Sequence, residues 1–207
     1  MYLSKLTLDP SHPHARRDLS DAYEMHRTLA RAFTPNPETV PARFLWRLER
    51  RADHQPSSVV LVQSIQPANW SSLNSFPDYA YEILPNKAVD LEALIQPDAR
   101  CRFRLLANPT VTRAGKRYGL TREDEQLAWI ARQGERHGFS VLDCVRSADE
   151  RLTVRQGRTG NRITLHTCLF EGILQVGVTE TLRQGMLNGF GHGKAFGLGM
   201  LSLARIG

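Results

Sequence analysis

The same order of predicted strands and helices occurs twice along this chain of 207 residues. In the first half, alternating apolar residues predict strands at 2–8, 41–51, 57–66 and 79–84, and helices are expected from Asp18 or Ser20 to Phe33 and over 68–76. In the second half, strands are expected at 100–112, 139–145, 151–155, 162–176 and 200–206, with helices over 121–137 and 179–187. The first half then has the order β-α-β-β-α-β of a split βαβ unit, and the second half is interpreted as another such unit, with one further short strand expected between its two helices. The predicted fold class is α+β, with two ferredoxin-like (RRM-like) domains in tandem, 1–92 and 93–207.

Several connecting segments carry weaker signals. Residues 11–18, with two histidines and a proline, predict a loop, and so do residues 112–120. A linker is expected over 86–97. Thr121 and Asp124 resemble a capping box at the start of the second domain's first helix, whose apolar face is expected to be Leu127, Trp129, Ile130 and Ala131.

The composition excludes several classes of protein. At 41% hydrophobic and 23% charged residues, the chain lies in the ordinary globular range, and no apolar run reaches the roughly 18–20 residues of a membrane span. The first ten residues, MYLSKLTLDP, do not contain a basic stretch followed by an apolar one, so no signal peptide is predicted. Cys101, Cys144 and Cys168 form no CxxC pair, which argues against a disulfide scaffold and a cysteine zinc site. We therefore expect a cytoplasmic protein without a membrane partner, with the cysteines as small apolar residues in or near strands.

The positive charge lies in the second half. Residues 1–92 hold 10 basic and 11 acidic residues, a net charge of −1, whereas the remainder holds 17 and 10, a net charge of +7. Of the 27 basic residues, only four are lysine. Arginine binds phosphate through two parallel hydrogen bonds and stacks on bases, so this distribution favours a nucleic-acid partner. A solvated basic surface, or an arginine-rich proteome, would give the same composition.

The first predicted helix carries the most specific group of side chains. Its apolar stripe is formed by Ala22, Met25, Leu29, Ala32 and Phe33. Beside that stripe, the sequence places a phenol, an imidazole and two guanidinium groups along one helix edge: Tyr23, His26, Arg27 and Arg31. A half-buried helix histidine beside an ordinary tyrosine would give the same spacing.

Such a set of groups can cleave RNA without a metal ion. A base removes the 2′-hydroxyl proton, the oxygen attacks the adjacent phosphate, an acid protonates the departing 5′-oxygen, and cations stabilise the developing charge. Histidine suits either proton role because its ordinary pKa is near 6.5. The sequence offers no competing metal site, since only His12 and His14 lie close together. No metal and no cofactor are expected.

Two further regions could contact phosphate. Residues 185–199, GMLNGFGHGKAFGLG, combine six glycines with His192, Gly193 and Lys194. Glycines allow close approach of the backbone to a ligand, although a flexible packing loop is the alternative. The spacing matches neither a Walker A loop nor a dinucleotide fingerprint.

Basic residues also gather in two further segments. One is the loop that holds Lys116 and Arg117. The other surrounds the turn QGRTGN, where a hairpin that carries arginines could enter the groove of an RNA stem: Arg151, Arg155, Arg158 and Arg162. The alternative is a solvated hairpin.

With these residues in view, the chain resembles the CasE family, the repeat-processing endoribonucleases of type I-E CRISPR systems within the repeat-associated (RAMP) superfamily. The matching segments are MYLSKL, DAYEMHRTLARAF, FRLLANP, GKRYGL, EQLAWIARQ, CLFEGILQV and GHGKAFGLGMLSLARI, in family order over nearly the whole chain. Together they are specific, whereas the glycine loop alone would indicate only the superfamily.

The resemblance implies a tandem ferredoxin-like fold and metal-independent cleavage of precursor CRISPR RNA at the base of the repeat stem-loop. It implies that Tyr23 and His26 are catalytic, that Arg31 takes the place of a supporting cation, and that the stem is bound around Arg158. The implied partners are CRISPR repeat RNA and the other subunits of the type I-E surveillance complex. The alternative is a non-catalytic RNA-binding subunit of such a complex.

Overall fold

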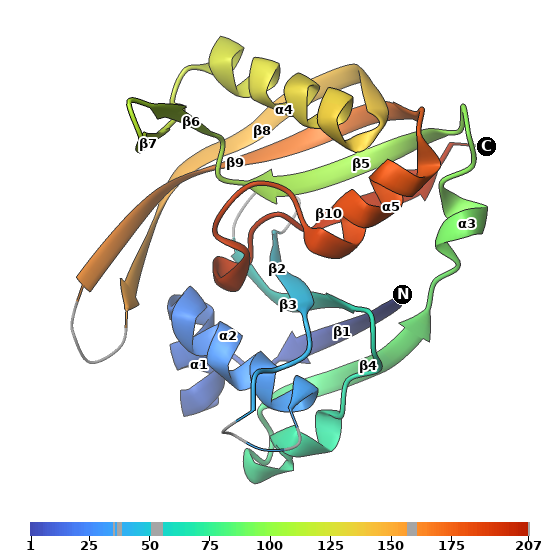
Figure 1. Ribbon diagram of the computed structural model, residues 1–207. Helices are drawn as coiled ribbons and strands as arrows, with labels where there is room; N and C mark the ends of the chain where they lie inside the picture. The colour runs from blue at the N-terminus through green and yellow to red at the C-terminus, as the bar shows by residue number, and fades with distance from the viewer. Residues whose placement is uncertain (35, 37–38, 51–55, 157–160, 207) are drawn as a thin grey trace. The chain divides into compact units, whose positions relative to one another are not determined.

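The computed structural model of this chain describes residues 1–34, 36, 39–50, 56–156 and 161–206 (Figure 1). Contacts divide the chain into two compact units. The first contains Met1–Val89, Val154–Ile163 and Ala195–Gly197, and the second contains the rest. The bounds 1–92 and 93–207 for the two ferredoxin-like domains remain a prediction.

The elements of the first half are β1 (Tyr2–Leu8), α1 (Pro13–Ser20), α2 (Ala22–Ala30), η1 (Arg31–Phe33), β2 (Phe44–Arg50), β3 (Pro56–Ser64), η2 (Trp70–Ser75) and β4 (Ala80–Ala88), where η denotes a 3₁₀ helix. The second half contains α3 (Leu91–Leu94), β5 (Arg100–Ala107), β6 (Thr110–Arg113), β7 (Lys116–Gly119), α4 (Glu123–His137), β8 (Phe139–Gln156), β9 (Asn161–Val176), α5 (Thr179–Asn188), η4 (Lys194–Phe196) and β10 (Leu201–Arg205).

Two four-stranded sheets confirm the predicted fold class. The first has the order β2-β3-β1-β4 and the second the order β10-β5-β9-β8. When only the four strands of each sheet are counted, in chain order, each sheet joins its first strand to its third and fourth, and these pairs are antiparallel. This is the strand order of a ferredoxin-like unit, and it occurs twice. A separate two-stranded sheet pairs β6 with β7.

The core of the first unit forms where the apolar stripe of the helices meets one face of the sheet. Met25 and Leu29 of α2 are buried in the same cluster as alternate residues of the strands, such as Leu6, Phe44 and Val60. Figure 1 shows α1 and α2 lying together beside this sheet. The amphipathic pattern predicted for α2 is therefore confirmed.

Alternate residues of β5 point into the core of the second half. Cys101, Phe103 and Leu105 are buried, as predicted, while Arg100 and Arg102 are exposed. Burial raises the pKa of the Cys168 thiol to about 12, so this side chain stays protonated and behaves as a small apolar group. Cys101 and Cys168 are buried and Cys144 is half-buried, and all three lie within strands, as predicted.

The loop predicted at 11–18 is wrong. Helix α1 begins at Pro13, and proline is favoured at the first helical position because the N–H that it lacks would have no partner there. The predicted helix start at Asp18 or Ser20 is wrong as well. Asp21 ends α1 and begins α2, because its carboxylate accepts a hydrogen bond of 2.9 Å from the backbone N–H of Tyr23.

Other local predictions also need correction. Helix α4 begins at Glu123 without a side-chain cap, since Asp124 is bonded to Arg122 at 2.8 Å instead of forming a capping box. Ala131 is exposed, so it is not part of the apolar face. The predicted loop at 112–120 holds most of the β6–β7 hairpin. The predicted linker at 86–97 contains the end of β4 and all of α3, so it is only partly a loop. The two strands expected at 139–145 and 151–155 form one strand, β8, and residues 70–75 form the 3₁₀ helix η2.

Candidate active site

Helix α2 presents Tyr23, His26 and Arg27 at its edge. The Asp21 cap fixes the start of the helix, and burial of Met25 and Leu29 fixes which face turns toward the core. Tyr23 and His26 are half-buried at the border of that face, and Arg27 is exposed. The arrangement brings a phenol and an imidazole to neighbouring positions on one helix edge, as predicted from their spacing of three residues.

The His26 imidazole lies in an apolar setting. Its ring stacks on Phe44 of β2, with 4.9 Å between the ring centroids and an interplanar angle of 16°. Its Nδ1 atom is buried and has no hydrogen-bond partner within the part of the chain that the structure describes. Burial lowers the pKa of His26, because the charged imidazolium loses hydration. The neutral imidazole therefore predominates near neutral pH.

Arg27 lies close to Tyr23 on the same helix. The centre of its guanidinium group lies 5.9 Å from the centroid of the tyrosine ring. The same guanidinium donates hydrogen bonds of 3.0 and 3.1 Å to the two carboxylate oxygens of Glu24. Glu24 also lies 3.7 Å from Arg17 of α1. Arg27 therefore offers a positive charge beside the phenol, partly balanced by Glu24.

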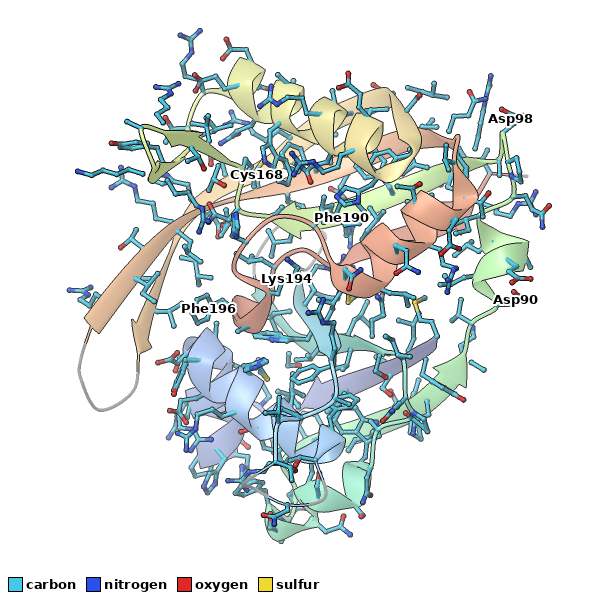
Figure 2. The ribbon with its side chains drawn as sticks, in the orientation of Figure 1. Asp90, Asp98, Cys168, Phe190, Lys194 and Phe196 are labelled. Carbon is cyan, nitrogen blue, oxygen red and sulfur yellow. The ribbon has the colours of Figure 1, made fainter. Side chains whose placement is uncertain are left out.

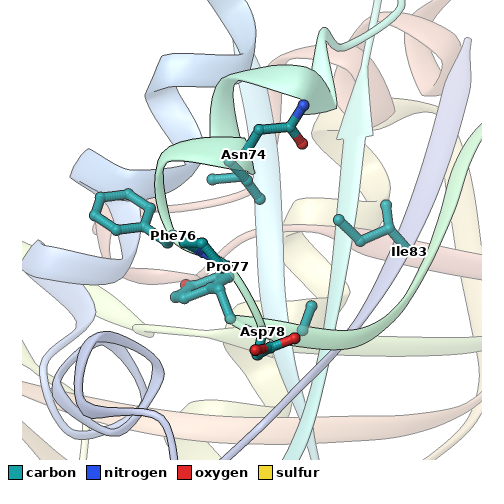
Figure 3. A pocket seen from close by; sticks show the side chains of 8 residues that line it. Asn74, Phe76, Pro77, Asp78 and Ile83 are labelled. Carbon is teal, nitrogen blue, oxygen red and sulfur yellow. The ribbon is translucent and has the colours of Figure 1, made fainter.

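Arg31 lies in a different setting. At the start of η1, its guanidinium packs over the Phe76 ring at 4.9 Å, and the His14 ring also lies 4.6 Å from that ring. Phe76 in turn lines a pocket of about 280 Å³ beside the start of β4, together with Tyr79 and Ile83 (Figure 3). Arg31 is exposed, so its long side chain has room to adopt other orientations.

The glycine-rich loop gathers positive charge in the second unit. Lys194 donates a hydrogen bond of 2.6 Å to the carbonyl of Gly191, and His192 forms an isolated β-bridge with Asn108. Partial burial and the charges of Arg117 and Lys194 lower the pKa of His192. The charge of Arg117 thus acts on His192, although 75 positions separate the two residues in the sequence. Figure 2 shows Lys194 on this loop, between Phe190 and Phe196.

The last part of the loop packs against β2. Gly197 has a positive φ of 79°, and a Cβ atom there would lie 2.9–3.2 Å from three ring carbons of Trp46. Trp46 is buried, so its ring has little freedom to move away. The glycine is required both by its backbone conformation and by this close approach.

Gly197→Ala is therefore expected to destabilise the protein more than the same substitution at a glycine that has a similar positive φ but open space around it. Gly115 is the matched control, because its φ is 73° and a Cβ atom there would have no neighbour within 4 Å. We expect Gly115→Ala to lower the free energy of unfolding by about 1–2 kcal/mol. Gly197→Ala should add a further ~1–3 kcal/mol from overpacking. Urea unfolding measures both, and equal losses would show that the Trp46 contact is unimportant.

The remaining predicted RNA contacts are only partly described. Lys116, Arg151 and Arg162 are exposed on β7, β8 and β9. Arg155 lies within β8, but its side chain is not among those described, and Arg158 lies outside the described residues. Within the described ranges, no three histidine, cysteine or acidic side chains form a possible metal-binding group. No helix among the described residues is long and apolar enough to cross a membrane.

Comparison with known proteins identifies the family. A family model described as CRISPR associated protein matches residues 1–205. The chain belongs to this family. The match spans both ferredoxin-like halves, including α2 and the glycine-rich loop.

Relatives within the family confirm the resemblance to CasE. The chain is 39% identical over 216 aligned residues to the CRISPR-associated endoribonuclease Cse3 of Thermus thermophilus, covering 99% of this chain and 100% of the relative. It is 27% identical to the Cascade subunit CasE of Escherichia coli, covering 99% of each. A structure of T. thermophilus Cse3 bound to an RNA representing a pre-cleavage complex superimposes with a TM-score of 0.86, at 39% identity, and covers 98% of each chain.

The sequence did not single out Phe44, Trp46 or Phe76 as parts of the site. Phe44 and Trp46 alternate along β2, and that pattern indicates only that they face a core. Their proximity to α2 and to the glycine-rich loop depends on tertiary packing. Phe76 follows η2 without a motif of its own.

Proposed function

We propose that this member of the family is a metal-independent endoribonuclease that cleaves precursor CRISPR RNA at the base of the repeat stem-loop. The observation that carries the proposal is the pairing of Tyr23 with a half-buried, neutral His26 on one edge of α2. Full-length similarity to a relative named endoribonuclease supports it, as does similarity to that relative's structure with a pre-cleavage RNA.

The proposed reaction is an internal transesterification. The 2′-hydroxyl upstream of the cut loses its proton to a base, and its oxygen forms a bond to the adjacent phosphorus. The bond from phosphorus to the 5′-oxygen breaks, and an acid protonates that oxygen. The products are a 2′,3′-cyclic phosphate and a 5′-hydroxyl. General acid–base groups accelerate such steps, and nearby cations stabilise the charge that develops on the phosphate.

The side chains of α2 suit this chemistry. Neutral His26 can accept a proton near neutral pH, and its buried Nδ1 leaves Nε2 as the nitrogen that would exchange protons with RNA. The Tyr23 phenol, with Arg27 beside it, can donate to a phosphate oxygen or take part in proton transfer. In this proposal Arg31 turns from the Phe76 ring toward the RNA and supplies the second cation.

RNA binding would depend on the basic half of the chain. Arg117, His192 and Lys194 lie close enough to form one positive region, and Gly193 has the positive φ of 87° that lets the backbone approach a phosphate. Lys116 neighbours this region on β7, and the β8–β9 hairpin would contact the stem through Arg151, Arg155, Arg158 and Arg162. The chain would then remain, in the cytoplasm, with the other subunits of a type I-E surveillance complex.

One experiment decides between this proposal and a non-catalytic RNA-binding subunit. The purified chain is incubated with a repeat stem-loop RNA in EDTA, and the product ends are identified. Cleavage at the base of the stem with a 5′-hydroxyl product supports the endoribonuclease. Binding without cleavage in any buffer would support the scaffold, and cleavage that strictly requires added divalent ions would overturn metal independence.

The arginine hairpin is expected to supply much of the RNA affinity. Replacing Arg155, Arg158 and Arg162 together with alanine should weaken stem-loop binding, since each neutralised phosphate releases counterions. The slope of log Kd against log salt should flatten by up to about one unit per lost phosphate contact. Replacing Arg183 serves as a control, because it is paired with Glu180 on α5 at 2.8 Å and lies outside the proposed RNA surface. An unchanged Kd and slope in the triple variant would show that this hairpin is only a solvated surface.

A further inference from the structure

The orientation of His26 is not fixed by a hydrogen bond to its inner nitrogen. In many catalytic histidines, the second ring nitrogen donates to a carboxylate or a backbone carbonyl, and this bond holds the ring in place. Here Nδ1 is buried, and none of the described residues accepts from it or donates to it. Another contact must therefore restrict rotation of the imidazole.

A stack of aromatic rings provides that contact. The His26 ring lies almost parallel to Phe44, at 16° and 4.9 Å, and Phe44 lies almost parallel to Phe33, at 11° and 4.5 Å. Trp70 packs nearly perpendicular to Phe33, with 6.1 Å between the ring centroids. Phe44, Phe33 and Trp70 are each less than 10% exposed, so the stack rests on the closely packed core of the first unit.

Phe44 connects the helix histidine to the sheet. It is the first residue of β2 and lies opposite Ser64 in the antiparallel pairing with β3. The backbone of Phe44 is therefore held by the strand ladder and not by α2, which carries His26. Phe33, in contrast, belongs to η1, which directly follows α2 in the chain.

We propose that Phe44 is a positioning residue for His26, whose flat ring holds the imidazole plane in the orientation that the cleavage reaction needs. The inference rests on the function proposed above. The stack restricts rotation about the bond from Cβ to the imidazole ring, and it covers one face of that ring against water. Catalysis is sensitive to such control, because a displacement of about 1 Å can cost about 100-fold in rate.

Three variants separate positioning from a general loss of packing. Phe44→Leu keeps an apolar side chain but removes the flat ring, while Phe44→Tyr keeps the ring. Phe33→Leu is the matched control, since it makes the same change one ring further from His26. We expect Phe44→Leu to reduce the single-turnover cleavage rate about 10- to 100-fold at saturating protein, with the Kd for uncleavable RNA unchanged. Phe44→Tyr should retain most of the rate, and Phe33→Leu should reduce it by less than about threefold.

A second readout needs neither RNA nor activity. Proton NMR titration of the free protein follows the His26 ring in the wild type and in each variant. Because Phe44 shields the imidazole, Phe44→Leu should raise the pKa of His26 toward its ordinary value and broaden or shift its ring signals. Phe44→Tyr and Phe33→Leu should leave the pKa of His26 near that of the wild type.

These results distinguish failure of the inference from failure of the proposed function. If Phe44→Leu and Phe33→Leu slow cleavage equally, or if neither changes the His26 titration, Phe44 is only a core residue and the inference is overturned. If the His26 titration changes as expected but no variant or wild-type protein cleaves RNA, Phe44 still orients His26 and the endoribonuclease proposal fails. Should Phe44→Leu prove unfolded by circular dichroism, Phe44→Met replaces it, and the same comparison with Phe33→Met decides.

Discussion

His26→Ala is expected to slow cleavage of a repeat stem-loop by about 10²–10⁴-fold, the usual contribution of one acid–base group. The reason is that His26 is the neutral, half-buried imidazole on the edge of α2 beside Tyr23, and no other histidine of the described chain shares that helix. Single-turnover rates at saturating protein measure the chemical step. The affinity for uncleavable RNA should change little, because the histidine acts mainly in the transition state.

His137→Ala is the matched control for this experiment. His137 is also a partly buried histidine whose pKa is lowered, first by burial, and it packs edge-on against Phe190 at 4.8 Å. Its replacement costs a comparable amount of packing without touching the proposed chemistry, so cleavage by this variant should stay close to the wild-type rate. Wild-type-like cleavage by His26→Ala would remove His26 from the catalytic assignment and leave Tyr23 and the cations to explain any activity.

Most strands of the two four-stranded sheets, and with them the fold class, could be predicted because they depend on local patterns. Alternation of Cys101, Phe103 and Leu105 with arginines gives the correct buried face of β5 without tertiary information. Helix α1 could not be found in this way, because its eight residues include a run of three charged residues, Arg16–Asp18, and few apolar positions. Its formation depends on burial of Ala15 and on the Asp18 carboxylate, which accepts a hydrogen bond of 2.8 Å from Tyr79, 61 residues away.

The candidate site shows the same division between local and tertiary information. The spacing of Tyr23 and His26 follows directly from helical geometry, so these two positions could be predicted. Three other features depend on contacts between distant segments: the stack of His26 on Phe44, the packing of Arg31 over Phe76, and the influence of Arg117 on His192. The segments of each pair are between 18 and 75 residues apart in the chain, and no local pattern reports such distances.

A single 2′-deoxy nucleotide just upstream of the cut is expected to abolish cleavage. In the proposed reaction the 2′-oxygen of that nucleotide is the nucleophile, so its removal leaves the imidazole of His26 with no proton to take and the phosphorus with no attacking atom. The remaining groups of the site, including Tyr23 and Arg27, would still bind the RNA. Product should therefore fall below detection while the Kd rises by no more than about tenfold, since the loss of one hydrogen bond costs about 0.5–1.5 kcal/mol.

The position of the deoxy substitution makes this test specific. The same substitution one nucleotide downstream of the cut removes a hydroxyl that takes no part in the reaction, and that RNA should be cleaved at a rate close to that of the all-ribose substrate. Both RNAs are tested in EDTA with wild-type protein, and the ends of the control product are identified by treatment with a phosphatase and a kinase. Cleavage of the upstream-deoxy RNA would mean that water attacks the phosphate. In that case His26 would activate a water molecule, and the product would carry different ends from the 2′,3′-cyclic phosphate and 5′-hydroxyl expected here.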